Sequence, residues 1–397
     1  MDRVQTGLAI AWIIAAPRIF GVLRILSPSL IDRVGSRKKV AATGYFLSPV
    51  FLLLLPAGLP LLIRWNATSP SPEPVLWLIG LIWALYHLVE YFATVALWSW
   101  LGDFLHPAIR SRFLARRERF MVMGQLIGRF GAGLYAYLTY EIFQASGELW
   151  RAYLVPVWPG ILFLFLAAIP VLGIPEIDWE RTVNLRERVR NLAVPLTSRR
   201  FLLFLLFGCW IQIAGGLSQS SQSFYQMKLL GVSALFTLFL NSGTQIGQMV
   251  LARPVGVWLS RWGDRRVMIL SLLIVSTGSL FYLIATPTRW EPIVVAAVVW
   301  IGWIGVNIGI SNRLIALSEP GNRGSAIALF FTLSTLAFGL STLLGGFLFD
   351  HFRDSIWRLP GVTRGIRWFD LIFLATFLGR AAGILFLLPD RSPRETP

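Results

Sequence analysis

The chain of 397 residues is 55% hydrophobic and 14% charged, with a mean hydropathy of +0.65. This composition excludes a soluble protein, which must cover its surface with polar groups. The net charge of +16 is spread along the sequence rather than gathered in one region, so it does not indicate a nucleic-acid-binding domain.

Eleven apolar runs follow one another, each long enough to cross a hydrocarbon core of about 30 Å as a helix. They lie at 7–29, 40–63, 75–101, 119–141, 153–174, 201–227, 231–258, 267–287, 292–316, 324–349 and 368–389. Barrel strands would be roughly ten residues long and would alternate in polarity, a pattern that these runs lack. The sequence therefore predicts an all-α membrane protein with 11 transmembrane helices.

Basic residues distinguish the two sides of the predicted membrane. The loops after the odd-numbered runs carry 22 Lys and Arg, and the loops on the other side carry nine. The positive-inside rule places the odd-numbered loops and the C-terminus in the cytoplasm. The loop before the last run is an exception, because it places four arginines outside.

One basic turn occurs twice, each time between two apolar runs. Residues 30–39 read LIDRVGSRKK, and residues 259–266 read LSRWGDRR. Gly35 and Gly263 permit the positive φ or the close approach that so short a turn needs. The repeat predicts two related helical bundles joined end to end.

The predicted bundles comprise residues 1–174 and 201–397, joined by a basic cytoplasmic linker at 175–200. The linker is either an interfacial helix on anionic headgroups or a solvated loop. Two runs precede the turn in the second bundle and one in the first, so the first helix of the first bundle is missing. A truncated start and a natural deletion both explain this difference.

These features together resemble the major facilitator superfamily, whose basic turn reads Gly-x-Leu-Ala-Asp-Arg-x-Gly-Arg-Arg/Lys. Pro28 and Ser260 depart from that pattern, and Ser260 replaces an acidic residue. The resemblance implies two six-helix bundles, alternating access and an uncharacterised bacterial member in the inner membrane. It also implies a gating role for the matching residues Asp32, Arg33, Gly35, Arg37, Lys38, Gly256, Gly263, Arg265 and Arg266.

Three charges lie near the predicted midplane of the first bundle. Arg18, Glu90 and Arg129 are each about 15–17 Å from the cytoplasmic end of their runs, at ~1.5 Å per residue. Because such charges are costly in lipid, we expect them to face the protein interior or an aqueous cavity. Glu90 either exchanges a proton during transport or forms a static ion pair with one of the two arginines.

His87 lies one helical turn before Glu90 in a stripe of polar and aromatic residues. Its reference pKa of about 6.5 suits proton transfer, although a neutral hydrogen-bond donor is the alternative. In the second bundle, polar and aromatic residues suggest either a substrate site or hydrogen bonds between helices. The candidates there are Gln212, Gln219, Asn241, Gln245, Trp303, Asn307 and Arg380.

The chain lacks a phosphate-binding loop, a metal-ligand pattern and a nucleophile motif, so we expect neither an enzyme nor a cofactor. We predict a monomeric transporter that contacts membrane lipid, a small-molecule substrate and protons. Two arginines against one glutamate at mid-depth favour an anionic or polar organic solute. A non-transporting membrane scaffold that retains the fold, and a flippase for amphiphiles, are the alternatives.

Overall fold

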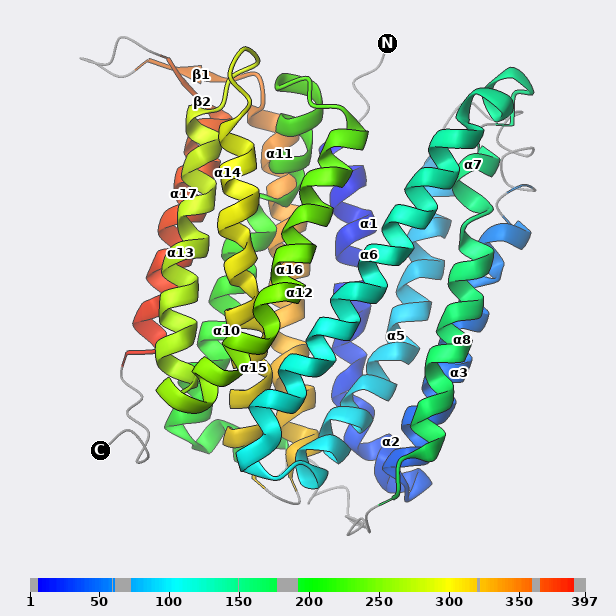
Figure 1. Cartoon of the computed structure of the whole chain (residues 1–397), viewed down its shortest axis with the longest axis vertical. Coiled ribbons are helices and arrows are strands. Elements are labelled where there is room, and N and C mark those ends of the chain that lie inside the picture. Colours follow the sequence, from blue (N-terminus) through cyan, green and yellow to red (C-terminus); the bar gives the residue numbers. More distant parts are fainter. Residues whose placement is uncertain are drawn as a thin grey trace.

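The computed structural model describes residues 6–58, 60, 73–148, 150–176, 192–319, 322–358 and 365–388. Long helices dominate this part of the chain and run along one common axis (Figure 1). The stretch at 177–191, where an interfacial helix is one of the two predictions, lies outside the described residues.

The helices before residue 174 form what we call the first bundle. They are α1 (Thr6–Phe20), η1 (Gly21–Leu26), α2 (Ser27–Val34), α3 (Arg37–Leu52), α5 (Glu73–Phe104), α6 (Pro107–Ala145), α7 (Trp150–Leu154) and α8 (Val157–Gly173). The segments α1, η1 and α2 follow one another directly.

The elements from residue 199 onward form the second bundle. They are α10 (Arg199–Leu217), α11 (Gln219–Phe224), η2 (Tyr225–Leu229), α12 (Ala234–Trp262), α13 (Asp264–Ile284), α14 (Pro292–Val299), η3 (Trp300–Gly302), α15 (Trp303–Leu317), α16 (Arg323–Phe352), β1 (Ile356–Trp357), β2 (Ile366–Arg367), α17 (Trp368–Ala382) and η4 (Gly383–Phe386). The two short strands pair antiparallel, with Ile356 opposite Arg367.

Both basic turns are built on a glycine with positive φ. Gly35 ends α2 at φ 70°, and its N–H donates to the carbonyl of Ile31 at 2.7 Å. Gly263 separates α12 from α13 at φ 83°. The predicted conformation is therefore confirmed at both positions, and both turns lie at the lower end of Figure 1, which we call the basic end.

The two bundles pack against each other in a reciprocal way. The helix before the turn in the first bundle, α1, packs against α16, and the helix before the turn in the second bundle, α12, packs against α6. Within the bundles, α3 packs against α5 and α8, as α13 packs against α15 and α17. This correspondence makes α6 the counterpart of α16, and α8 the counterpart of α17.

The second bundle contains α10, which packs against α16 and α17. Among the described helices of the first bundle, none stands in the corresponding place before the turn. The difference is visible in burial, because only 22% of the apolar window of α7 and α8 is covered, against 33% for the span that contains α17, the counterpart of α8.

Nine helical segments in the described residues are long and apolar enough to cross a membrane, which fits an integral, multi-pass membrane protein. The long helices α6 and α12 are not among the nine, although they have 39 and 29 residues. They pack against each other, which shields part of their polar surface from lipid. The number of 11 spans therefore stays a prediction.

The start of α6 corrects the predicted boundary at residue 119. The helix begins at Pro107, where the ring nitrogen Nδ1 of His106 accepts a hydrogen bond from the N–H of Ala108 at 3.3 Å. Proline suits the first helical position and arginine is a good helix former, so the arginines between 110 and 119 are helical rather than in a loop.

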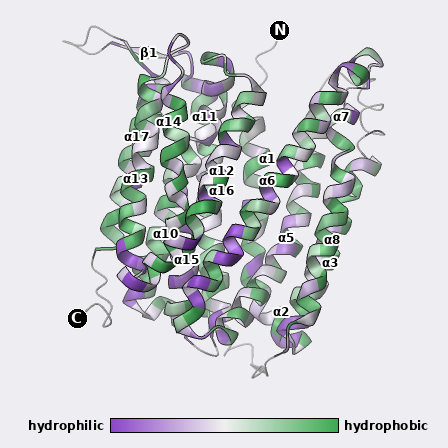
Figure 2. Cartoon of the chain, in the orientation of Figure 1, coloured by the Kyte–Doolittle hydropathy of each residue, from purple (hydrophilic) through white to green (hydrophobic). Residues whose placement is uncertain are grey.

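The largest cluster of buried apolar side chains crosses from one bundle to the other. It joins Trp98 and Leu114 of the first bundle to Leu259 and Ile315 of the second. Figure 2 shows hydrophilic residues gathered toward the basic end and apolar residues along the length of the helices. The bundles are thus held together by apolar packing close to the basic end.

Candidate functional site

Glu90 lies near the middle of α5 and is held by two neighbours on the same helix. Its Oε1 accepts a hydrogen bond from Thr94 Oγ1 at 2.9 Å, and its Oε2 lies 3.3 Å from Nδ1 of His87. Thr94 is in turn 3.2 Å from the hydroxyl of Tyr45 on α3. The side chains of Glu90 and His87 remain 27% and 23% exposed, so both can still exchange partners.

An arginine that interacts electrostatically with this carboxylate is Arg24 of η1, a residue that the sequence did not single out. Arg24 is only 3% exposed, its Cζ lies 3.7 Å from the centroid of the Tyr91 ring, and its Nε donates to the carbonyl of Gly21 at 2.9 Å. A stacked cation with one hydrogen bond is stabilised in place, but its remaining donors stay available to an anion.

The structure does not support the static ion pairs considered for Glu90. Arg18 is directed toward α16, with its Cζ 5.3 Å from the centroid of the Phe338 ring. Arg129 is exposed on α6, and within the described residues no ion pair joins it or Arg18 to Glu90. Counting residues along a helix predicts a depth for these arginines, but it does not predict the direction in which they point.

Arg380 and Trp303 meet inside the second bundle. The Cζ of Arg380 lies 5.4 Å from the centroid of the Trp303 ring, and its Nη1 donates to Ser279 Oγ at 3.4 Å. Arg380 is 7% exposed. The contacts that hold Arg380 therefore come from its own bundle, and within the described residues no ion pair or hydrogen bond joins it to Arg18, Glu90 or Arg129.

The polar candidates on α10 and α12 differ in what they contact. The amide Nε2 of Gln245 donates to Oε1 of Gln125 on α6 at 3.1 Å, which links the two bundles. Gln212 and Gln219 are half-buried, and their backbone carbonyls accept hydrogen bonds from Ser341 and Ser223. Asn241 and Asn307 are exposed.

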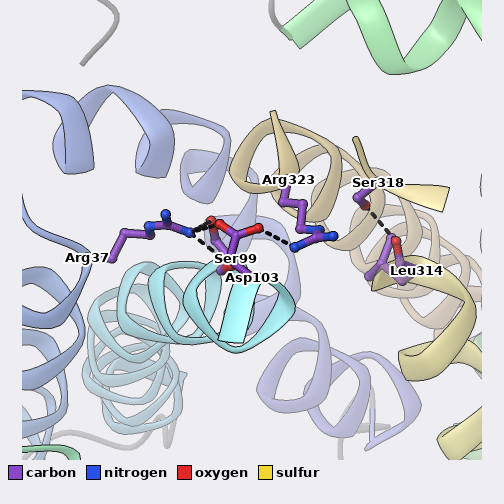
Figure 3. Close-up of polar contacts among 6 residues, drawn as sticks. All are labelled: Arg37, Ser99, Asp103, Leu314, Ser318 and Arg323. Carbon is purple, nitrogen blue, oxygen red and sulfur yellow. Dashed lines mark hydrogen bonds and ion pairs between the residues drawn. The ribbon is translucent and has the colours of Figure 1, made fainter. Parts of the chain in front are cut away.

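At the basic end, a single carboxylate connects three helices (Figure 3). Arg37, the first residue of α3, is 3% exposed and pairs with Asp103 Oδ2 of α5 at 2.5 Å. The same guanidinium donates to the carbonyl of Ser99 at 3.0 Å. The other carboxylate oxygen of Asp103 pairs with Nη1 of Arg323, at the start of α16 in the second bundle. We call Arg37, Asp103 and Arg323 the latch.

The other predicted gating residues surround the latch or the second turn. Asp32 is buried, Arg33 is exposed and Lys38 is half-buried. Arg265 Nη2 donates to the carbonyl of Leu388 at 2.6 Å, and Arg266 is exposed.

Gly256 lies where α12 touches α6, because a Cβ added to it would lie 2.6 Å from that of Ala115. Its role is therefore close packing between the bundles rather than a turn.

Sequence reasoning missed Asp103, Arg323 and Arg24. Asp103 stands at the end of an apolar run and just before five arginines, a pattern that suggests a counter-ion. Arg323 is separated from it by 220 residues, so no local pattern connects the two. Arg24 lies inside an apolar run, six residues nearer its cytoplasmic end than Arg18, and its charge within that run was a signal that could have found it.

The sequence model of the Major Facilitator Superfamily matches residues 225–397 of the chain. The E. coli fucose:proton symporter FucP superposes with a TM-score of 0.67 at 13% identity, and the match covers 98% of this chain and 96% of that chain. The human organic anion transporter MFSD10 gives a TM-score of 0.63 at 14% identity, over 96% and 83% of the two chains.

A bacterial homologue of the iron transporter ferroportin, in an outward-facing state, gives a TM-score of 0.57 at 12% identity over 98% and 99% of the two chains. A search of curated protein sequences finds no match. At these identities the structural likeness defines the fold alone.

The described residues thus form two reciprocally packed helical bundles, with a partly exposed carboxylate midway along α5 and an ion pair between the bundles at one end. The Major Facilitator Superfamily model matches most of the second bundle, and the fold of both bundles is similar to that of solved transporters.

Proposed function

We propose that this protein moves a small solute by alternating access, as a secondary transporter of the bacterial inner membrane with its basic end and C-terminus in the cytoplasm. In this proposal residues 1–174 and 201–397 are the two moving bundles, and 175–200 is the linker. The observation that carries it is the latch, because Asp103 binds Arg37 of its own bundle and Arg323 of the other. A contact of this kind must break before the bundles can separate at that end.

The mid-depth cluster supports a role for Glu90 and His87 in coupling. Glu90 lies 13 residues before Asp103 on α5, which is about 20 Å at ~1.5 Å per residue. A substrate or a proton at Glu90 therefore acts on the same rigid helix that carries the latch carboxylate. Arg18, and Arg24 six residues closer to the basic end, add positive charge to this bundle, which favours an anionic or polar organic solute.

A different observation favours the scaffold alternative: apolar side chains on the outside of the first bundle are exposed. Large apolar side chains of α6 and α8 are more than half exposed, among them Ile127, Leu138 and Phe163. In the second bundle the corresponding helices, α16 and α17, pack against α10. If no other helix packs against these side chains, one wall of the transport path is open to lipid, and a purely structural role becomes the better explanation.

Uptake into vesicles separates the two functions. A thermal-shift screen of the purified full-length protein with organic anions, sugars and nucleosides identifies solutes that stabilise it. We expect at least one of them to enter proteoliposomes in a saturable manner that protein-free vesicles lack. Binding without uptake, under either an imposed pH gradient or a solute gradient, would favour the scaffold.

A further inference from the structure

A cavity of about 570 Å³ lies where α6 and α12 run side by side (Figure 1). Its lining contains four arginines and three other side chains, namely Arg112, Arg116, Arg119, Arg253, Ala115, Phe120 and Val257. Three of the arginines come from α6 of the first bundle and one comes from α12 of the second. We call this cavity the arginine crevice.

The four guanidinium groups share one face of the contact. Arg112, Arg116 and Arg119 follow each other at spacings of four and three residues, which aligns them along α6. Arg253 lies one turn before Gly256, the residue at which α12 comes closest to Ala115 of α6. The close approach of the helices at Gly256 and Ala115 thus brings the arginine of one bundle toward those of the other.

Carboxylates do not neutralise this crevice within the described residues. None of the ion pairs found there involves Arg112, Arg116, Arg119 or Arg253. The nearest acidic residue in sequence, Glu118, is 3.9 Å from Arg117 instead, and Arg117 turns inward over the Trp98 ring. Four like charges around one cavity repel each other, so an anion placed among them is strongly favoured.

The level of the crevice indicates what kind of anion fits. Arg119 stands at the predicted start of an apolar run, and Arg253 lies five residues inside the cytoplasmic end of another. This is the level of lipid headgroups in the proposed orientation. Phe120 and Val257 add apolar surface beside the arginines. Guanidinium groups bind phosphate oxygens in pairs, with better geometry than ammonium groups.

We propose that the arginine crevice binds a phosphate group, carried either by the headgroup of an anionic phospholipid or by a free phosphate. The bound phosphate touches both bundles, because its ligands come from α6 and α12. If the proposed transport function is correct, occupancy stabilises the arrangement in which the latch is closed. The binding itself does not depend on transport and is tested without it.

The test measures binding of short-chain phosphatidate, short-chain phosphatidylcholine and inorganic phosphate to the delipidated full-length protein in neutral detergent. We compare the wild type with Arg116→Gln, Arg253→Gln and the charge-preserving Arg253→Lys. Arg199→Gln is the matched control, because Arg199 is an exposed arginine on α10 outside the crevice. Each glutamine in the crevice removes a charge-assisted contact, and we expect the Kd for phosphatidate to rise about tenfold.

We expect Arg199→Gln to bind phosphatidate within about twofold of the wild type, since it lies outside the crevice. Arg253→Lys should bind more tightly than Arg253→Gln but more weakly than the wild type, since it keeps the charge and loses the paired geometry. Binding of phosphatidate but not of inorganic phosphate identifies the lipid as the source. Binding of both, weakened by the same two substitutions, identifies the phosphate group alone. Equal affinity of the wild type, Arg116→Gln and Arg253→Gln for phosphatidate would overturn the proposal.

Discussion

At the scale of single residues, the mid-depth carboxylate is held by groups that can change their protonation or their partners. Glu90 contacts His87 and Thr94 and faces the charge of Arg24, rather than being locked into a bidentate ion pair. Coupling requires a group that loses and regains a proton as its surroundings change, and this arrangement permits it.

Glu90→Gln is expected to abolish uptake driven by a pH gradient while leaving counterflow exchange of the solute intact. The amide keeps the size and the hydrogen bond to Thr94 but cannot exchange a proton. Uptake and counterflow in proteoliposomes are the two measurements. Glu141→Gln, at an exposed position of α6, should leave both unchanged. Unaltered pH-driven uptake in Glu90→Gln would exclude the coupling role.

The latch depends on a single residue, because the carboxylate of Asp103 pairs with two guanidinium groups. Asp103→Asn removes the charge that pairs with Arg323 of the other bundle, which costs the closed form about 3 kcal/mol and shifts the opening equilibrium by roughly a hundredfold. The reporter is the maleimide reaction rate of Ile315→Cys, which is 1% exposed in the closed form.

We expect the Asp103→Asn protein to react faster than its parent, both in a Cys209→Ala background that removes the native thiol. Asp354→Asn, at an exposed acidic residue with an ion pair of 3.6 Å to Arg353, is the control and should not change the rate. Identical rates in Asp103→Asn and the control would show that the latch does not hold this end closed.

At the scale of elements, the contact between α6 and α12 depends on one small residue. A Cβ on Gly256 would lie 2.6 Å from the Cβ of Ala115 and 3.3 Å from the carbonyl of Ser111. Such contacts force helices apart, and the separation would spread along two helices that also share the Gln245 to Gln125 hydrogen bond.

Gly256→Ala is therefore expected to lower the free energy of unfolding by about 1–3 kcal/mol. Gly243→Ala on the same helix is the matched control, since a Cβ there meets nothing within 4 Å. That control should be neutral or stabilising by up to about 1 kcal/mol, because alanine is the better helix former. Thermal unfolding of the two purified variants checks this, and equal melting temperatures would contradict the packing role of Gly256.

At the scale of the whole molecule, the reciprocal contacts of α1 with α16 and of α12 with α6 make two seams between the bundles. The seams and the buried apolar cluster around Trp98 and Ile315 leave the bundles joined at the basic end. The two bundles can therefore rock against each other about these two helix contacts.

The orientation of the molecule is open to a direct test. With Cys209 replaced by alanine, Lys39→Cys at the basic end should be protected from a membrane-impermeant maleimide in intact cells. Thr288→Cys, in the exposed turn at the opposite end, should be labelled. We expect this result because the basic end carries the surplus of Lys and Arg, and loops rich in Lys and Arg lie in the cytoplasm. Labelling of Lys39→Cys alone would reverse the proposed orientation.

The sequence by itself determined the membrane-spanning helices, the duplicated turn and the positive φ of Gly35 and Gly263. These features depend on local composition and backbone sterics, which act over a few residues and need no distant partner. The neighbourhood of Glu90 with His87 and Thr94 followed for the same reason, since the three lie on one face of one helix.

Only the tertiary structure decided that Arg24 interacts with Glu90, that Asp103 joins Arg37 to Arg323, and that Arg253 lines one cavity with three arginines of α6. Each of these depends on how helices are rotated about their axes and on which helices become neighbours. That rotation is set by packing summed over whole surfaces, such as the fit of Gly256 against Ala115, and a linear pattern of charges does not contain it.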